Sequence, residues 1–204
     1  MLAVATVVVS DQSYVTGEAA LVEAANAVPT WVGWPFRIVM QLGTLWVALV
    51  VVGGLAWWTR RAGMLAPAAA AVAVAIAFRT DNWLKDVVDR PRPSAVLDGL
   101  EVREHIGGFG FPSGHTTMAV ALAAALQPAL PRPAQRVAWA LAAVVAVTRM
   151  HVGAHWPADL VGGAALGVAI GAAAWLVVDR LPACWFAPPE RPGPAGHGGY
   201  GSEP

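Results

Sequence analysis

Three short stretches of this chain place cations, imidazoles, a hydroxyl and a carboxylate within an otherwise apolar sequence. They read Lys85-x6-Arg92-Pro93, Pro112-Ser113-Gly114-His115 and Arg149-x5-His155-x3-Asp159. Cations can hold a phosphate, one imidazole can attack it, and a second can protonate the leaving group. The first stretch also contains the only lysine of the chain. Taken together, the stretches predict phosphoryl transfer through a histidine, without a metal.

The third stretch predicts a histidine paired with a carboxylate. Trp156-Pro157 suits the start of a helix, because proline is tolerated in the first turn. Asp159 then lies in that turn, four residues after His155. A carboxylate there can accept a hydrogen bond from one ring nitrogen and leave the other as a nucleophile. The alternative is that the two residues only cap the helix. A buried ionisable pair at the end of a membrane helix favours a functional role over a purely structural one.

The second stretch is typical of an anion-binding helix start. Ser113 and Gly114 would present backbone N–H groups to a phosphate, and the helix dipole would help. His115, in the first turn, could donate a proton to a leaving oxygen. The alternative is an ordinary serine cap beside an incidental histidine.

The first stretch supplies candidate phosphate ligands. Arginine can bind phosphate oxygens in a bidentate manner, whereas lysine acts as a point charge. The Arg90-Pro91-Arg92-Pro93 repeat leaves either arginine as a possible partner of Lys85. A charged interfacial loop is the alternative.

A metal site is less favoured by the sequence. His151 and His155 are four residues apart, which keeps a zinc site as an alternative. Gly153 and Pro157 argue against one continuous helix there, and His105 has no partner at helical spacing. We therefore expect no metal and no cofactor.

The composition indicates a membrane protein. Of 204 residues, 57% are hydrophobic and 13% are charged, and ten are tryptophan. The formal net charge is zero, so nothing suggests binding to nucleic acid. Cys184 is the single cysteine, which excludes a disulfide framework within the chain.

Apolar segments predict the fold. Five could cross a bilayer, and in lipid such segments must be helical. They are 38–58, 64–84, 115–130, 137–147 and 160–178. The last carries Gly162, Gly163, Gly167 and Gly171, spaced for close approach of another helix. We expect an all-α, polytopic transmembrane bundle of about five spanning helices.

The ends of the chain differ from this core. Residues 1–35 are expected to hold the short apolar segment 2–9 and an interfacial helix over 17–28, with Trp31 and Trp34 at interface depth. Residues 36–180 form the expected transmembrane domain, and 181–204 a disordered Pro/Gly-rich tail.

Counting helices places all three stretches on one membrane face. The turns containing Arg60-Arg61, Arg132, Arg136 and Arg180 fall on the other face. The motif face has more cations in total. Once Lys85, Arg92 and Arg149 are set aside for chemistry, the balance tips slightly toward the opposite face as cytoplasmic.

The order and internal spacing of the three stretches resemble the signature motifs of the type 2 phosphatidic acid phosphatase superfamily. This superfamily includes lipid phosphate phosphatases, prenyl-diphosphate phosphatases and vanadium haloperoxidases. The resemblance covers residues 85–159. One position departs from the pattern, because Thr148 stands where serine often precedes the arginine of the third motif.

The resemblance implies a role for each residue. His155 would be the nucleophile that becomes phosphohistidine, Asp159 would orient it, and His115 would be the general acid. The phosphate ligands would be Lys85, Arg92, Ser113, Gly114 and Arg149. The family core commonly has six helices, so the segment 2–9 is interpreted as the end of a truncated first helix.

We therefore expect a metal-independent membrane phosphatase acting on a lipid phosphate or a prenyl diphosphate. The alternatives are a phosphotransferase to an acceptor other than water, or a non-catalytic transporter or scaffold with a phosphate pocket. A haloperoxidase is disfavoured by the apolar spans. The Ala-, Gly- and Arg-rich composition suggests a bacterium of high GC content, in which this family places its site on the outer face of the plasma membrane. The expected partners are the lipid substrate and the bilayer.

Overall fold

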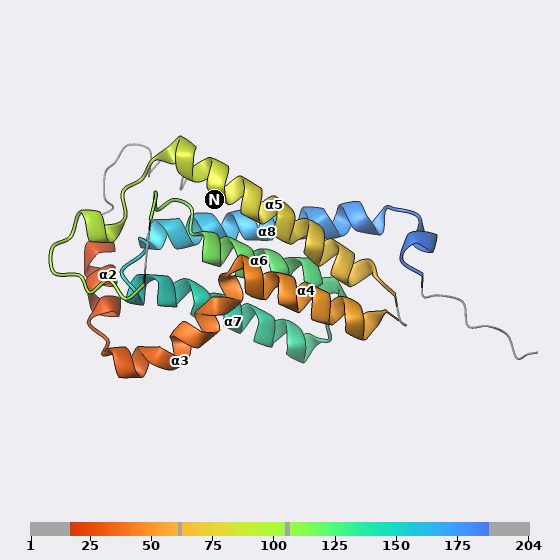
Figure 1. Ribbon diagram of the computed structural model, residues 1–204, viewed down its shortest axis with the longest axis horizontal. Coiled ribbons are helices and arrows are strands. Elements are labelled where there is room, and N and C mark those ends of the chain that lie inside the picture. The colour runs from red at the N-terminus through yellow and green to blue at the C-terminus, as the bar shows by residue number, and fades with distance from the viewer. Residues whose placement is uncertain (1–16, 61–62, 105–106, 188–204) are drawn as a thin grey trace, which may run out of the picture.

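The computed structural model describes residues 17–60, 63–104 and 107–187, and within them every regular element is a helix (Figure 1). The α-helices are α2 (Glu18–Asn26), α3 (Thr30–Met40), α4 (Leu45–Thr59), α5 (Leu65–Val88), α6 (Gly114–Leu126), α7 (Arg132–His151) and α8 (Pro157–Asp179). Short 3-10 turns are η1 (Gln41–Gly43), η2 (Pro93–Ala95), η3 (Gln127–Ala129) and η4 (Ala183–Trp185). The expected all-α fold is confirmed.

The first expected span is not one straight helix, which corrects the prediction for 38–58. The chain bends by 68° between α3–η1 and α4. Thr44 adopts an extended backbone there, and its hydroxyl caps α4 by accepting from the N–H of Val47. Gly43 permits the bend against α6, since a Cβ on it would lie 2.6 Å from the carbonyl oxygen of His115.

Helices α6 and α8 pack closely through the predicted glycines. A Cβ on Gly163 would lie 2.8 Å from the carbonyl oxygen of Ser113, and one on Gly167 would lie 2.7 Å from that of Thr117. Larger side chains would push the helices apart. This packing fixes the start of α6 against the start of α8, which is where the second and third stretches lie.

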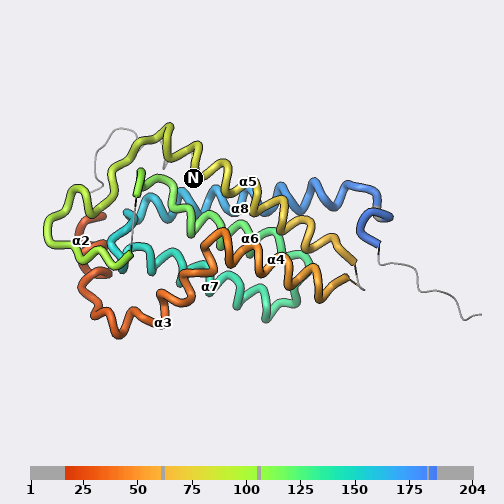
Figure 2. The backbone as a smooth tube through the Cα atoms, viewed as in Figure 1, coloured from red at the N-terminus to blue at the C-terminus, as the bar shows by residue number. Residues whose placement is uncertain are grey.

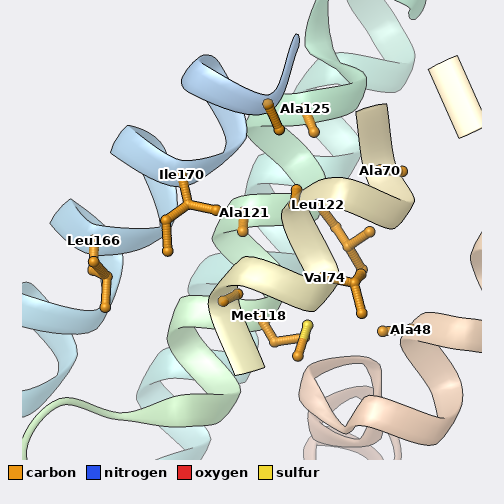
Figure 3. Packing of buried hydrophobic residues seen from close by; sticks show 12 residues of the cluster. Ala48, Ala70, Val74, Met118, Ala121, Leu122, Ala125, Leu166 and Ile170 are labelled. Atoms are coloured by element: carbon orange, nitrogen blue, oxygen red, sulfur yellow. The ribbon is translucent and has the colours of Figure 1, made fainter. Parts of the chain in front are cut away.

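Small side chains fill the core between α5, α6 and α8. Ala73, Ala77 and Ala121 are buried in one cluster with larger residues such as Met118 and Ile170 (Figure 3). Alanines allow the helix backbones to approach, and this close packing makes a rigid frame.

Length and hydropathy single out fewer spans than expected. Among the described helices, α8 alone is both long and apolar enough to cross a membrane, and the bent pair α3–η1 and α4 passes the same test jointly. The count of about five spans therefore stays a prediction.

The terminal segments are described in part. The helix expected over 17–28 is present as α2, and its place at the membrane interface stays a prediction. The segment 2–9, His105 and residues 188–204 lie outside the described residues. Within the expected tail, residues 181–187 are described and include η4.

Candidate active site

The end of α5 and the starts of α6 and α8 lie together at one end of the bundle, beside the end of α7 (Figure 2). The opposite end holds the α4–α5 and α6–α7 connections and η4. All three motif stretches therefore gather at the same end, as helix counting predicted.

His155 and Asp159 form the predicted pair. The ring nitrogen Nδ1 of His155 lies 3.3 Å from Oδ2 of Asp159, and both side chains are almost fully buried. The same oxygen accepts from the backbone N–H of Trp156 at 2.9 Å. The carboxylate thus caps α8 and contacts the imidazole, so capping and orientation are served by one residue.

Arg92 contacts the other ring nitrogen of His155. Its Nη1 lies 3.2 Å from Nε2 of the imidazole. A guanidinium can only donate, so Nε2 must be the unprotonated nitrogen and Nδ1 must carry the proton toward Asp159. Arg92 is held in place by the carbonyl oxygens of Gly107, Gly108 and Ala154.

The surroundings keep His155 neutral. Burial lowers the pKa of its imidazole well below the usual value, and the charges of Arg149, Arg92 and Lys85 lower it further. Burial and the charge of Arg149 also lower the pKa of Arg92, but a guanidinium stays cationic. An uncharged imidazole beside cations is suited to attack an anionic phosphate.

Arg90 and Arg92 of the repeat occupy different places in the structure. Arg90 is buried and donates to Oδ1 of Asp159 at 2.8 Å. Its second nitrogen donates to Glu18 at 2.6 Å. Arg92, and not Arg90, is therefore the arginine next to the imidazole of His155.

Ser113 and Gly114 lie at the start of α6. The Ser113 side chain is buried, and its hydroxyl accepts from Thr116 at 3.0 Å. Gly114 is in contact with Asp81, because a Cβ on it would lie 2.6 Å from that carboxylate. Lys85 donates to the same Asp81 oxygen at 2.6 Å, so the lone lysine is held beside the helix start.

His115 follows on α6 with a free ring nitrogen. Its Nε2 is buried and has no hydrogen-bond partner among the described residues. The imidazole interacts electrostatically with Arg149, His155 and Lys85, so the three stretches share one region. A buried, unpartnered nitrogen there is available for a substrate oxygen.

Arg149 is buried near the end of α7. Its Nη1 donates to the carboxylate of Glu104 and lies 3.2 Å from the sulfur of Met40. Its Nε is buried without a partner among the described residues. The guanidinium therefore keeps hydrogen-bonding capacity that a phosphate could use.

Histidine spacing does not bring ligands together. His151 turns toward α2, where its Nδ1 lies 3.0 Å from the carbonyl oxygen of Ala25. Within the described ranges no group of three or more His, Cys, Asp or Glu residues is placed to hold a metal ion. Among the described residues, His151 and His155 therefore have different neighbours.

The sequence did not predict the contacts that Asp81, Glu104, Glu18 and Arg90 make with the site. Asp81 holds Lys85, Glu104 holds Arg149, and Arg90 with Glu18 stands behind Asp159. The i,i+4 spacing of Asp81 and Lys85 is a signal that could have revealed the first pair. Glu18 lies 72 positions from Arg90 in the sequence, and no local pattern connects them.

Comparison with known proteins identifies the family. The family model of the PAP2 superfamily matches residues 65–182, more than half of the chain. The chain belongs to the PAP2 superfamily, the type 2 phosphatidic acid phosphatase family that its motifs resemble.

Two curated relatives act on lipid phosphates. The decaprenylphosphoryl-5-phosphoribose phosphatase of Mycobacterium tuberculosis is 34% identical over 137 residues, which is 67% of this chain and 71% of the relative. The lipid A 1-phosphatase of Rhizobium etli is 39% identical over 92 residues, or 42% of this chain and 39% of that enzyme. These comparisons confirm the family and the enzyme class expected from the sequence.

Two crystal structures share the fold. LpxE of Aquifex aeolicus superimposes with a TM-score of 0.69 and 22% identity, covering 76% of this chain and 92% of that chain. A transmembrane PAP2-type phosphatidylglycerolphosphate phosphatase from Bacillus subtilis gives 0.68 and 19%, covering 89% and 96%. The chain thus has the fold of membrane-embedded phosphatases.

Proposed function

We propose that this protein is a metal-independent membrane phosphatase that hydrolyses a lipid phosphate or prenyl diphosphate through a phosphohistidine at His155. The observation that carries this proposal is the state of one imidazole. His155 is buried, burial and nearby cations lower its pKa, its Nδ1 faces Asp159, and its Nε2 faces Arg92. That arrangement suits a nucleophile better than a structural histidine.

The first step is transfer of the phosphoryl group to His155. Its Nε2 forms a bond to phosphorus while the bond from phosphorus to the lipid oxygen breaks. His115, which takes up a proton when the negative charge of the substrate phosphate is bound beside it, donates that proton to the lipid oxygen, so the lipid leaves as an alcohol, or as a monophosphate when the substrate is a diphosphate. The carboxylate of Asp159 stabilises the positive imidazolium that forms.

The second step returns the enzyme to its starting state. His115, now neutral, takes a proton from water as the water oxygen attacks phosphorus. The bond between phosphorus and Nε2 breaks, inorganic phosphate leaves, and His155 is neutral again. Division into two transfers replaces one difficult displacement with two easier ones.

Fixed donors neutralise the phosphate charge in both steps. We assign Arg92, Arg149 and Lys85 as charged ligands, with the Ser113 hydroxyl and the Gly114 amide as neutral ones. Each lies on a helix end or is held by carbonyl or carboxylate partners, so little reorganisation is needed when charge develops.

Replacement of the proposed nucleophile tests the mechanism. We expect purified His155→Ala to fold and to release no phosphate from a panel of lipid phosphates, with or without a chelator. Thermal unfolding checks the fold, and exposed Glu23→Gln serves as the control variant. Normal turnover by His155→Ala would contradict the proposal, and phosphate found on an organic acceptor instead of in solution would favour the phosphotransferase.

We place the active site on the outer face of a bacterial plasma membrane. Arg90 supports this orientation, because it is buried between two carboxylates and is not a free loop cation of the motif face. When Arg90 is left out of the count, more free Lys and Arg side chains lie at the opposite end than at the motif end. That excess is expected for a cytoplasmic face.

The exposed Cys184 can report the orientation, because it lies in η4 at the opposite end and is the only cysteine of the chain. In intact cells a membrane-impermeant maleimide should not label it, whereas permeabilised cells should show labelling. Labelling in intact cells would reverse the orientation.

A further inference from the structure

An ion pair behind Asp159 connects the proposed active site to the N-terminal helix α2. Arg90 lies between two carboxylates, with 2.8 Å to Oδ1 of Asp159 and 2.6 Å to Oε2 of Glu18. All three side chains are at most 5% exposed. Charges withdrawn from water in this way are costly unless they are paired and hydrogen-bonded, and here each has a partner.

Glu18 is held by a second contact. Its other oxygen accepts from the backbone N–H of Ala158 at 2.8 Å, one residue before Asp159. Glu18 therefore bonds both to the guanidinium that holds the Asp159 carboxylate and to the helix turn that carries it. The contact ties α2 to α8 at the point where the nucleophile is oriented.

The charge balance has a consequence for His155. Arg90 alone would cancel the charge of Asp159 and make it a weaker partner for the imidazolium formed during phosphoryl transfer. With Glu18 present, two carboxylates share one guanidinium, and a net negative charge is left facing His155. Glu18 thus offsets the neutralising effect of Arg90 on the charge of Asp159.

We propose that Glu18 and Arg90 are positioning residues, which act through Asp159 to orient His155 and to stabilise its positive charge. This inference rests on the proposed phosphohistidine mechanism. It gives α2 a part in catalysis in addition to its expected place at the membrane surface. Neither residue contacts the substrate in this scheme.

The test compares Glu18→Gln with Glu23→Gln on the same helix. The glutamine keeps the size of Glu18 and an acceptor for Ala158, but it removes the charge. We expect kcat to fall about tenfold or more, a loss like that seen when the residues that orient metal-bound histidines are replaced. KM should stay close to wild type, whereas the thermal unfolding temperature should fall because a buried charge pair is broken, so kcat is compared per folded protein. Glu23→Gln should match wild type in kcat, KM and unfolding temperature.

A double-mutant cycle separates positioning from a general structural role. Turnover is followed with a 32P-labelled lipid phosphate, which detects rates far below that of the wild type. In an Asp159→Asn background, Glu18→Gln should cost less than about twofold, because its effect passes through the missing carboxylate. In the same background, Arg90→Gln should also lower kcat by less than about twofold.

Three outcomes would overturn the inference. They are unchanged kcat in Glu18→Gln, a loss that follows the loss of folded protein, or an equal loss in the Asp159→Asn background. Different results would contradict the proposed function. They are a wild-type protein that is inactive on every lipid phosphate, or a His155→Ala variant that is fully active.

Discussion

The two nitrogens of the His155 ring face regions of opposite charge. On the Nε2 side Arg92 lies 3.2 Å away. The charges of Arg149 and Lys85 also act on the ring. On the Nδ1 side Asp159 is the neighbour, and the two buried side chains behind it leave a net negative charge. The difference indicates that one side binds the phosphate and the other stabilises the nucleophile.

The largest effect is expected on the Nδ1 side. Asp159→Asn should lower kcat about 10³-fold with little change in KM, because the amide no longer stabilises the imidazolium or fixes its tautomer. Steady-state kinetics measure both constants, and exposed Asp86→Asn is the control. A large rise in KM would instead assign Asp159 to substrate binding.

A smaller effect of a different kind is expected on the Nε2 side. Arg92→Lys keeps the charge but loses the planar fork, so kcat/KM should fall about 100-fold. Exposed Arg79→Lys on α5 should have no effect. Loss of inhibition by inorganic phosphate should accompany the kinetic loss. If phosphate binds Arg92→Lys as tightly as wild type, the assignment of this side to the phosphate is wrong.

The smallest effect is a shift in pH dependence, and its sign should differ between the two sides. His155 must be neutral to attack, so the acid limb of kcat/KM follows its pKa. Arg92→Gln removes a cation that lowers this pKa and should move the limb to higher pH by about one unit or less. Asp159→Asn removes an anion and should move it to lower pH. Shifts of the same sign in both variants would contradict the division of the ring into two sides.

The sequence predicted the parts of the site that depend on local spacing. His155 and Asp159 are four residues apart across a helix start, so their contact follows from one turn of helix. Gly163, Gly167 and Gly171 of α8 lie at intervals of four, and they meet α6 as expected. Helix counting then brought the three stretches to one end.

Long-range packing set the features that the sequence did not predict. Arg90 contacts Glu18, which α2 brings across 72 positions, and it is Arg92 that contacts the imidazole. The bend before α4 depends on Gly43 meeting the backbone of His115. Apolar composition alone is the same for a straight span and for a bent one, so hydropathy could not distinguish them.

Trapping of the covalent intermediate tests the central claim most directly. Protein mixed with a 32P-labelled lipid phosphate would be quenched in alkali, in which phosphohistidine survives, and digested for mass spectrometry. The proposed mechanism predicts label on the peptide that contains His155, and none in His155→Ala. Label on His115, or rapid turnover with no labelled histidine, would contradict it.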